Sequence, residues 1–164
     1  MKPLNAALRI WVYALHGVAV EIMYTAAWDL VVNRNLKLHG ISHGWAFPIY
    51  GLAIFGIEMC HKALRDKLNI PLAFRCVFYA CVTLMWEFST GFVLRQFNAC
   101  PWDYAPWFHF HVLGLITFEY FPLWYFSTMF AEVYLIRYTL RLNLSERDRP
   151  EPRSASTHRR KSQY

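Results

Sequence analysis

Two glutamates interrupt apolar stretches of this 164-residue chain, and they are the first residues whose chemistry needs an explanation. Glu21 lies in the apolar stretch 8–32, and Glu87 lies in the apolar stretch 72–97. An ionised carboxylate that faces lipid costs a few kcal/mol or more, so such side chains turn toward the interior of a helix bundle. We therefore expect both carboxylates to face protein.

The neighbours of these glutamates favour close contacts between helices. Residues at i, i+4 and i+7 share a helix face, which places Thr83, Glu87 and Thr90 in one stripe. Gly17 lies in the matching position before Glu21. Small residues let helix backbones approach, and polar residues find partners across the contact. The simplest arrangement packs the two stripes against each other.

Two interpretations of the paired carboxylates stay open. Two neighbouring carboxylates in a low dielectric cannot both ionise cheaply, so one is protonated or a cation lies between them. In that case the pair forms a site for a proton, a cation or a polar headgroup. In the other interpretation, the glutamates only form hydrogen bonds between helices and thereby specify packing.

The pattern of glutamates also suggests an internal duplication. The apolar stretches 45–60 and 110–136 each carry a glycine followed by a glutamate, which is Glu58 in one and Glu119 in the other. Glutamates at corresponding places in the four stretches favour two parallel repeats of a helix pair, related by an axis along the membrane normal. The candidate intramembrane polar site consists of Glu21, Glu58, Glu87, Thr90 and Glu119.

A second group of candidate residues follows the third apolar stretch. Arg95 lies about 12 Å along the helix axis beyond Glu87, which places it at the outer interface. Pro101 is expected to stop the helix, and the tryptophan and tyrosine that follow are typical interfacial anchors. We expect an ordered lid over the outer mouth of the bundle, with the aspartate free to pair with Arg95 or to cap the next element. The lid residues are Arg95, Trp102, Asp103 and Tyr104.

Composition and segment length predict an all-α integral membrane protein. Hydrophobic residues make up 56% of the chain and charged residues 17%, whereas soluble domains carry about a quarter charged residues. A helix that crosses the hydrocarbon needs roughly 20 residues, and three of the four stretches reach that length while 45–60 is shorter. We expect an integral membrane bundle of about four transmembrane helices. The alternative, a soluble helical domain, would need polar faces that the stretch 112–130 almost lacks.

Basic residues predict the orientation in the membrane. Lys and Arg precede the first stretch, populate the segment 62–75 and follow Ile136, and cytoplasmic flanks of membrane helices are enriched in these residues. Both termini are therefore expected in the cytoplasm, with the organelle left open. We expect residues 1–142 to form the transmembrane domain and residues 143–164 to form a disordered basic tail. The basic excess lies mainly from Arg137 onward, so the net charge of +6 does not indicate nucleic-acid binding.

The remaining reactive residues form no recognisable catalytic or metal centre. The cysteines show neither metal-ligand spacing nor a disulfide framework, and the outer-loop histidines have no carboxylate or cysteine fixed beside them. No nucleophile elbow, glycine-rich phosphate loop or Walker motif is present. We therefore expect no metal and no cofactor. The residues concerned are Cys60, Cys76, Cys81, Cys100, His39, His43, His109 and His111.

One long motif carries a resemblance to a known family. The sequence WEFSTGFVLRQFNACPWDY at 86–104, followed by GLITFEY at 114–120, closely resembles the vertebrate transmembrane protein 229 family, particularly its B-type members. YALHG at 13–17, YTAAWD at 24–29 and IYG at 49–51 are similar to the same family. The resemblance implies a small multi-pass membrane protein that is distantly similar to bacterial membrane components of transporters. It implies no reaction, ligand or catalytic residue.

The sequence favours a non-catalytic membrane protein: a subunit, a scaffold, or a small transporter or carrier built around inward-facing glutamates. The alternative is a membrane-embedded lipid-binding protein or lipid-modifying enzyme, with Glu87, Arg95 and the outer histidines as its only plausible reactive set. Membrane lipids are the expected partners, together with a second copy of the chain or a partner membrane protein. No nucleic acid is expected.

Overall fold

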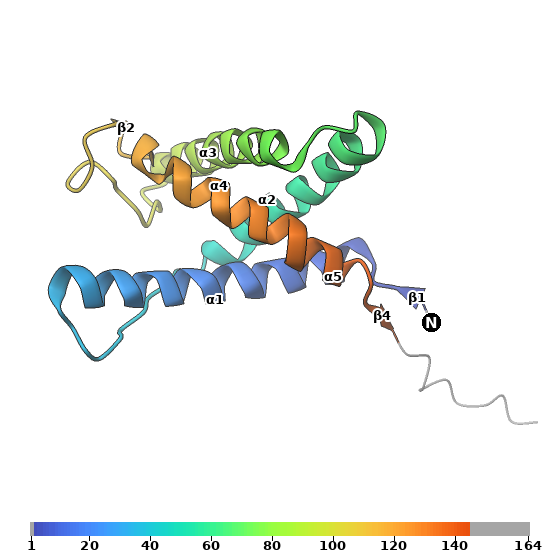
Figure 1. Cartoon of the computed structure of the whole chain (residues 1–164). Helices are drawn as coiled ribbons and strands as arrows, with labels where there is room; N and C mark the ends of the chain where they lie inside the picture. Colours follow the sequence, from blue (N-terminus) through green and yellow to red (C-terminus); the bar gives the residue numbers. More distant parts are fainter. Residues whose placement is uncertain (1, 145–164) are drawn as a thin grey trace, which may run out of the picture.

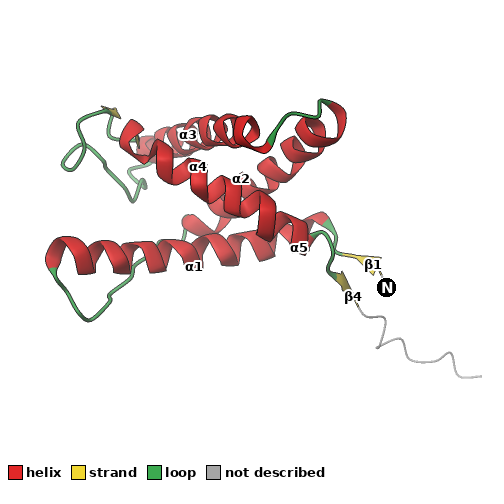
Figure 2. Ribbon diagram, in the orientation of Figure 1, coloured by secondary structure: helices red, strands yellow, loops and turns green. Residues whose placement is uncertain are grey.

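The computed structural model describes residues 2–144, which form a helical bundle (Figure 1). The prediction of a helical chain is confirmed, and Figure 2 shows how little strand accompanies the helices. The predicted disordered tail lies outside the described residues from Ser145 onward. The long helices are α1 (Ala6–Asn33), α2 (Ala46–His61), α3 (Leu72–Gln96) and α4 (Phe121–Phe130). Two π-helical turns extend this framework, η1 (Lys62–Lys67) after α2 and η3 (Ala131–Ile136) after α4, and α5 (Arg137–Thr139) ends the last helix.

Short strands close the two ends of the bundle. β1 (Lys2–Pro3) pairs antiparallel with β4 (Asn143–Leu144), which joins the start of the chain to the end of the last helix. β2 (His111–Val112) pairs antiparallel with β3 (Ile116–Thr117), and the 3₁₀ turn η2 (Phe118–Tyr120) then leads into α4.

Local sequence explains where the helices begin and end. The side chain of Asn5 accepts a hydrogen bond of 2.9 Å from the N–H of Leu8 and so caps α1. Arg34 ends α1 in the left-handed conformation with φ of 53°. Proline precedes the first residue of α3 and lies in the first turn of α4, where its missing N–H costs no hydrogen bond.

The helices are arranged as two antiparallel pairs. α1 packs along α2, and α3 packs along α4, while α2 also touches α3 and η3. In Figure 1, α1 runs along the bottom, α3 lies at the top, and α4 descends diagonally from the end near β2 toward β4. The buried core joins all four segments through Tyr13, Ile57, Tyr79 and Ile136. The described residues therefore form one bundle whose core lies near the end that holds β1 and β4.

Two details of the sequence prediction need correction. The fourth apolar stretch starts at 110, but its helix begins only at Phe121, because residues 111–117 form the β2–β3 hairpin. Gly114 adopts φ of 68° in the turn of this hairpin, a conformation that glycine reaches without strain. In addition, the two glutamate stripes do not pack directly against each other, because α1 pairs with α2 and α3 pairs with α4.

Two helices, α1 and α3, are long and apolar enough to cross a membrane. α2 has 16 residues and α4 has 10 before it continues into η3. Two of the four predicted crossings therefore meet the length and composition that a membrane span needs. This is weak support for membrane association.

Candidate functional site

Glu58 is the centre of a buried polar cluster at the inner end of the bundle, the end near β1 and β4. It is fully buried and accepts hydrogen bonds from the hydroxyl of Tyr13 at 2.7 Å and from Nε of Arg9 at 3.0 Å. Nζ of Lys62 lies 3.2 Å from its other carboxylate oxygen. Each partner is a donor, so this carboxylate is satisfied as an anion inside the α1–α2 pair.

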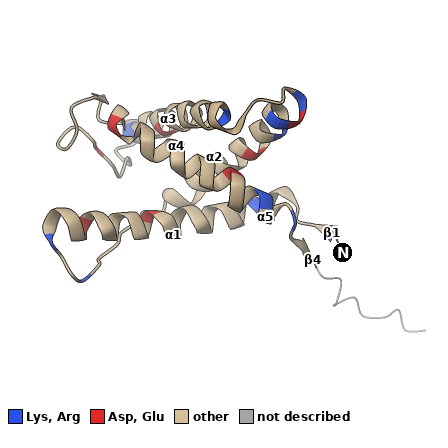
Figure 3. Ribbon diagram, in the orientation of Figure 1, with Lys and Arg blue, Asp and Glu red and all other residues tan. Residues whose placement is uncertain are grey.

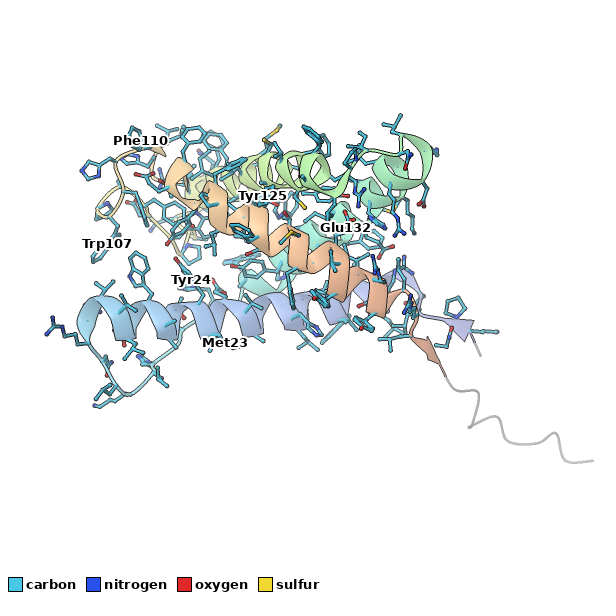
Figure 4. All side chains as sticks on the ribbon, viewed as in Figure 1. Met23, Tyr24, Trp107, Phe110, Tyr125 and Glu132 are labelled. Atoms are coloured by element: carbon cyan, nitrogen blue, oxygen red, sulfur yellow. The ribbon has the colours of Figure 1, made fainter. Side chains whose placement is uncertain are left out.

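Glu132 forms a second cluster of the same kind in the α3–α4 pair. Arg75 donates to both carboxylate oxygens, with Nε at 3.0 Å from Oε2 and Nη2 in contact with Oε1. Nδ1 of His61 lies 3.3 Å from Oε2. Figure 4 shows Glu132 pointing between the helices. Sequence reasoning missed this residue, although an arginine inside an apolar stretch, Arg75, was a signal that a buried acid must lie nearby.

Glu21 binds the loop that follows α1. The hydroxyl of Ser42 donates to Glu21, and Thr25 exchanges hydrogen bonds with the backbone of Ile41 in the same loop. On the α2 side, the phenol of Tyr50 lies within electrostatic range of both Glu21 and Glu87. The two predicted carboxylates therefore both lie in the vicinity of Tyr50, and each has its own hydrogen-bond partner, Ser42 for Glu21 and Tyr104 for Glu87.

Glu87 lies where α3 meets the long loop before α4. Its Oε1 accepts a hydrogen bond of 2.6 Å from the hydroxyl of Tyr104. Its Oε2 is buried and has no hydrogen-bond partner, and the same is true of Nε1 of Trp124 on α4. Thr90 instead donates to the carbonyls of Trp86 and Glu87 on its own helix. Trp124 lies beside the Glu87 carboxylate, but no hydrogen bond reaches Oε2 from the described residues.

Three of the four residues of the predicted lid lie in the segment between α3 and α4, and the fourth, Arg95, lies in the last turn of α3. Tyr104 reaches Glu87, and burial, together with the nearby carboxylate, raises the pKa of this phenol far above its usual range. Trp102 donates from Nε1 to the carbonyl of Leu115 at 3.0 Å and covers Gly91, where an added Cβ would lie 2.8 Å from the indole. Tyr104 consequently stays a hydrogen-bond donor, and Trp102 fixes the loop on α3.

The other two lid residues serve the loop itself. Arg95 donates to the carbonyl of Leu113 at 2.6 Å, and Asp103 accepts from the N–H of Ala105 at 3.0 Å. Among the described residues these two side chains form no ion pair with each other. Both line a polar pocket of about 260 Å³ together with Asn98, Cys100 and Trp102.

Glu119 lies in this loop and away from the other predicted glutamates. Its Oε1 accepts the backbone N–H groups of His109 and Phe110, and its Oε2 accepts the hydroxyl of Thr117. These donors lower the pKa of the Glu119 carboxyl to about 2, against the opposing effect of desolvation, which is the largest single contribution. Glu119 holds the turn before α4 in place, and the structure does not bring it to Glu87.

Aromatic rings cover the outer end of the bundle around Tyr104. Tyr104 and Tyr120 meet edge to face with centroids 5.3 Å apart, and Phe108 lies 4.8 Å from Tyr120. The hydroxyl of Tyr24 donates to that of Tyr120 at 3.1 Å, and Figure 4 shows Tyr24 directed from α1 toward the loop while Met23 points away. The rings touch each other, so they close this end by direct packing.

The described residues contain no group of three or more His, Cys, Asp or Glu side chains that could hold a metal ion. Among the same residues, all cysteines are free thiols. The arrangement instead offers buried carboxylates, phenols and an imidazole, which bind cations or exchange protons.

The fold and these buried carboxylates define a helical protein with two candidate membrane spans and a polar interior. The chain belongs to the family described as "Putative ABC-transporter type IV", whose sequence model matches residues 8–148. No solved structure matches the chain. The family description associates the chain with membrane components of transporters and assigns no activity to any residue.

Proposed function

We propose that the chain is a multi-pass integral membrane protein with four crossings, formed by α1, α2, α3, and α4 with η3. The outward faces of these helices support this proposal because they carry many large apolar side chains. Soluble proteins rarely expose so many large apolar side chains, and extended apolar surface marks contact with membrane or protein. The most exposed helical examples are Met23, Val31, Phe74, Met85 and Phe126. The resemblance to the transmembrane protein 229 family agrees with this topology.

The same proposal places both termini in the cytoplasm. Figure 3 shows basic residues at the end of the bundle that holds η1, α5 and the N-terminus. Lys62, Arg65 and Lys67 lie on η1, and Arg137 begins α5. Arginine and lysine accumulate on cytoplasmic flanks, which supports this end as the cytoplasmic one.

We further propose that the bundle is built from two repeats, α1–α2 and α3–α4. Arg9, Tyr13 and Glu21 on α1 have the same spacing as Arg75, Tyr79 and Glu87 on α3. The sequence FPIY at 47–50 precedes Glu58 by the same distance as FPLW at 121–124 precedes Glu132. The counterpart of Glu58 in this scheme is Glu132, in place of Glu119.

In each proposed repeat, one carboxylate is paired with an arginine, and we propose that the other is free to take up a proton or a cation. Glu58 and Glu132 are held by arginine at the cytoplasmic end, which is a structural role. Glu21 and Glu87 lie farther along the bundle and face Tyr50. We propose that the chain is a non-catalytic transporter-related membrane subunit or small carrier, and that Glu21 and Glu87 form its intramembrane site. The observation that carries this proposal is the buried, unpartnered Oε2 of Glu87.

Melting curves of detergent-purified wild type and Glu87→Gln test the proposal across pH 5 to 8, with and without Na⁺, K⁺, Ca²⁺ and lipids. A ligand at about 100 times its Kd stabilises the folded state by about 2.7 kcal/mol, which raises Tm by roughly 5–11 °C for a chain of this size. We expect wild type to respond to pH or to one cation and Glu87→Gln to lose that response. Asp66→Asn removes an exposed carboxylate on η1 and is the matched control. Identical responses of wild type and Glu87→Gln to every condition would leave only the packing role.

A lipid-binding function is the second candidate, because an apolar pocket of about 240 Å³ lies between α1 and the last helix. Its lining is mostly apolar and aromatic, with the imidazole of His16 beside these side chains. A fluorescent acyl-chain probe tests this function. Quenching of the bound probe by the new tryptophan in Phe130→Trp would support binding at this pocket. Unchanged probe fluorescence in that variant would exclude it.

A further inference from the structure

Buried polar side-chain atoms without a hydrogen-bond partner gather along one line of the described bundle. One such atom lies on α2, three lie on α3 and one lies on α4. Native proteins satisfy nearly all buried polar groups, so a cluster of exceptions calls for an explanation. The atoms are Nδ1 of His61, the hydroxyl of Tyr79, Oγ1 of Thr83, Oε2 of Glu87 and Nε1 of Trp124. Polar neighbours lie beside most of them: His61 and Tyr79 lie beside Glu132, and Glu87 lies beside Trp124, so a small shift or a bridging water would satisfy them.

The three members on α3 are evenly spaced. Tyr79, Thr83 and Glu87 follow one another at intervals of four residues, so they share a face and lie roughly 6 Å apart along the axis. Tyr79 is fully buried and Thr83 is 8% exposed. A single water molecule spans a gap of this size by bonding to the group on either side. We call the series from His61 through Tyr79 and Thr83 to Glu87 the polar track.

The inner end of the track reaches the cytoplasmic surface. Tyr79 lies beside Arg75 and Glu132, and Cys76 lies close to the same pair. Nδ1 of His61 is 3.3 Å from Glu132. The other ring nitrogen of His61 lies 3.5 Å from the guanidinium of Arg65, which is an exposed residue of η1. An imidazole therefore stands between the buried acid and the solvent.

The outer end of the track reaches the lid. Glu87 accepts the hydroxyl of Tyr104 at 2.6 Å. Tyr120 also lies within range of the Glu87 charge, and it accepts the hydroxyl of Tyr24 at 3.1 Å. Tyr50 approaches Glu87 from α2, and Glu21 lies beyond it on α1. Carboxyl and phenol groups thus continue the track to the outer aromatic cluster.

The members of the track share one chemical property. A hydroxyl, a protonated carboxyl or a neutral imidazole can accept one hydrogen bond and donate a different one. Each side chain can therefore receive a proton from one neighbour and release a proton to the next without moving. Apart from the nearby Arg75, the track holds no fixed positive charge that would bind an anion. The described residues also hold no group of three ligands for a metal ion. The chemistry of the track therefore suits protons.

We propose that the polar track conducts protons between Glu87 and the His61–Glu132 pair, so that H⁺ is the cargo or the coupling ion of the membrane site. This inference rests on the proposed function, since it needs a bundle that spans the membrane. In one transfer, a proton from the outer side bonds to Glu87, and the chain of hydroxyls and bridging water releases another proton at His61. Every O–H or N–H bond formed along the track is matched by one broken, and no electrons are exchanged.

Proton uptake by liposomes that contain the purified full-length chain tests this inference. A potassium gradient with valinomycin sets the membrane potential, and an enclosed pH-sensitive dye reports the flux. We expect wild type to exceed protein-free liposomes and Thr83→Val to reduce its flux about tenfold, which is about 1.4 kcal/mol in the barrier. Thr83→Ser keeps the hydroxyl and should restore the flux. Ser89→Ala removes a hydroxyl on the exposed side of α3 and should leave it unchanged.

Each outcome decides the inference. If wild-type flux equals that of protein-free liposomes, proton conduction along the track is overturned. The proposed membrane site is tested separately, and it would still be supported if wild type showed a pH response in its melting curve that Glu87→Gln lacked. Wild-type flux in a folded Thr83→Val variant also overturns it. If Thr83→Val does not fold, Tyr79→Phe takes its place: it removes one hydroxyl of the track, and undiminished flux in that variant has the same meaning.

Discussion

Glu132→Gln is expected to destabilise the bundle strongly, because it leaves the buried guanidinium of Arg75 without its counter-charge. The two side chains are 10% and 3% exposed, and Arg75 donates to both oxygens of Glu132. Removing one partner of a buried ion pair costs about 3–5 kcal/mol. For a chain of this size each kcal/mol lowers Tm by about 2–4 °C, so the expected loss is roughly 6–20 °C.

A double-mutant cycle shows whether the loss comes from the uncompensated charge. Arg75→Met combined with Glu132→Leu replaces the pair with apolar side chains of similar volume, which is often neutral for stability. The double variant should therefore melt well above either single variant, as measured by tryptophan fluorescence in detergent. If the two single losses simply add in the double variant, the reasoning about a buried, coupled pair is wrong.

Lys62→Met is the matched control for this cycle. Lys62 pairs with Glu58 at 3.2 Å, but its side chain is 48% exposed, and the carboxylate retains Arg9 and Tyr13. Exposed ion pairs contribute about 0–1 kcal/mol. Tm should therefore fall by no more than roughly 4 °C, and a loss as large as that of Glu132→Gln would contradict the assignment.

Three further predictions concern the lid and the topology. Gly91→Ala places a Cβ 2.8 Å from Trp102, so the lid should loosen and Cys100 should react faster with a maleimide; an unchanged rate would show that Trp102 does not depend on this contact. Glu119 has a folded-state pKa of about 2 against an ordinary value of 4.5, so its stabilising contribution is present above pH 4.5 and is lost as the pH falls toward 2. The difference in Tm between wild type and Glu119→Gln should shrink over that interval, and a difference independent of pH would refute the hydrogen-bonding role. In intact cells, a variant whose only cysteine is Cys100 should react with a membrane-impermeant maleimide while a C-terminal tag stays protected, and labelling of the tag would reverse the proposed orientation.

The sequence predicted the long helices and the end of α3 because both depend on local signals. Apolar stretches over 8–32 and 72–97 correspond to α1 and α3 within a few residues. Pro101 and the aromatic residues after it predicted a loop at the end of α3, whereas the hydrogen bond from Tyr104 to Glu87 was not predicted. Each of these inferences needed only helix periodicity and the turn chemistry of proline.

The start of α4 depended on contacts that periodicity does not reveal. Residues 110–120 are as apolar as a helix, but Gly114 permits a turn and Glu119 binds two backbone N–H groups of the same loop. A glutamate in an apolar stretch was therefore read as a helix residue although its partners are local. The similarity of FPLW at 121–124 to FPIY at 47–50 was the signal that would have placed the start of α4 correctly. The same alignment matches Glu58 with Glu132.

The most direct test of the central claim is an experimental map of the protein in lipid nanodiscs, bound to a rigid antibody fragment and detailed enough to resolve ordered water and ions. We expect density within hydrogen-bond distance of Oε2 of Glu87, continuing along α3 past Thr83 toward Tyr79. The same density should be lost in Glu87→Gln at the same pH. A dry, fully packed interface around Glu87 in the wild type would contradict the account and leave these glutamates with a role in helix packing alone.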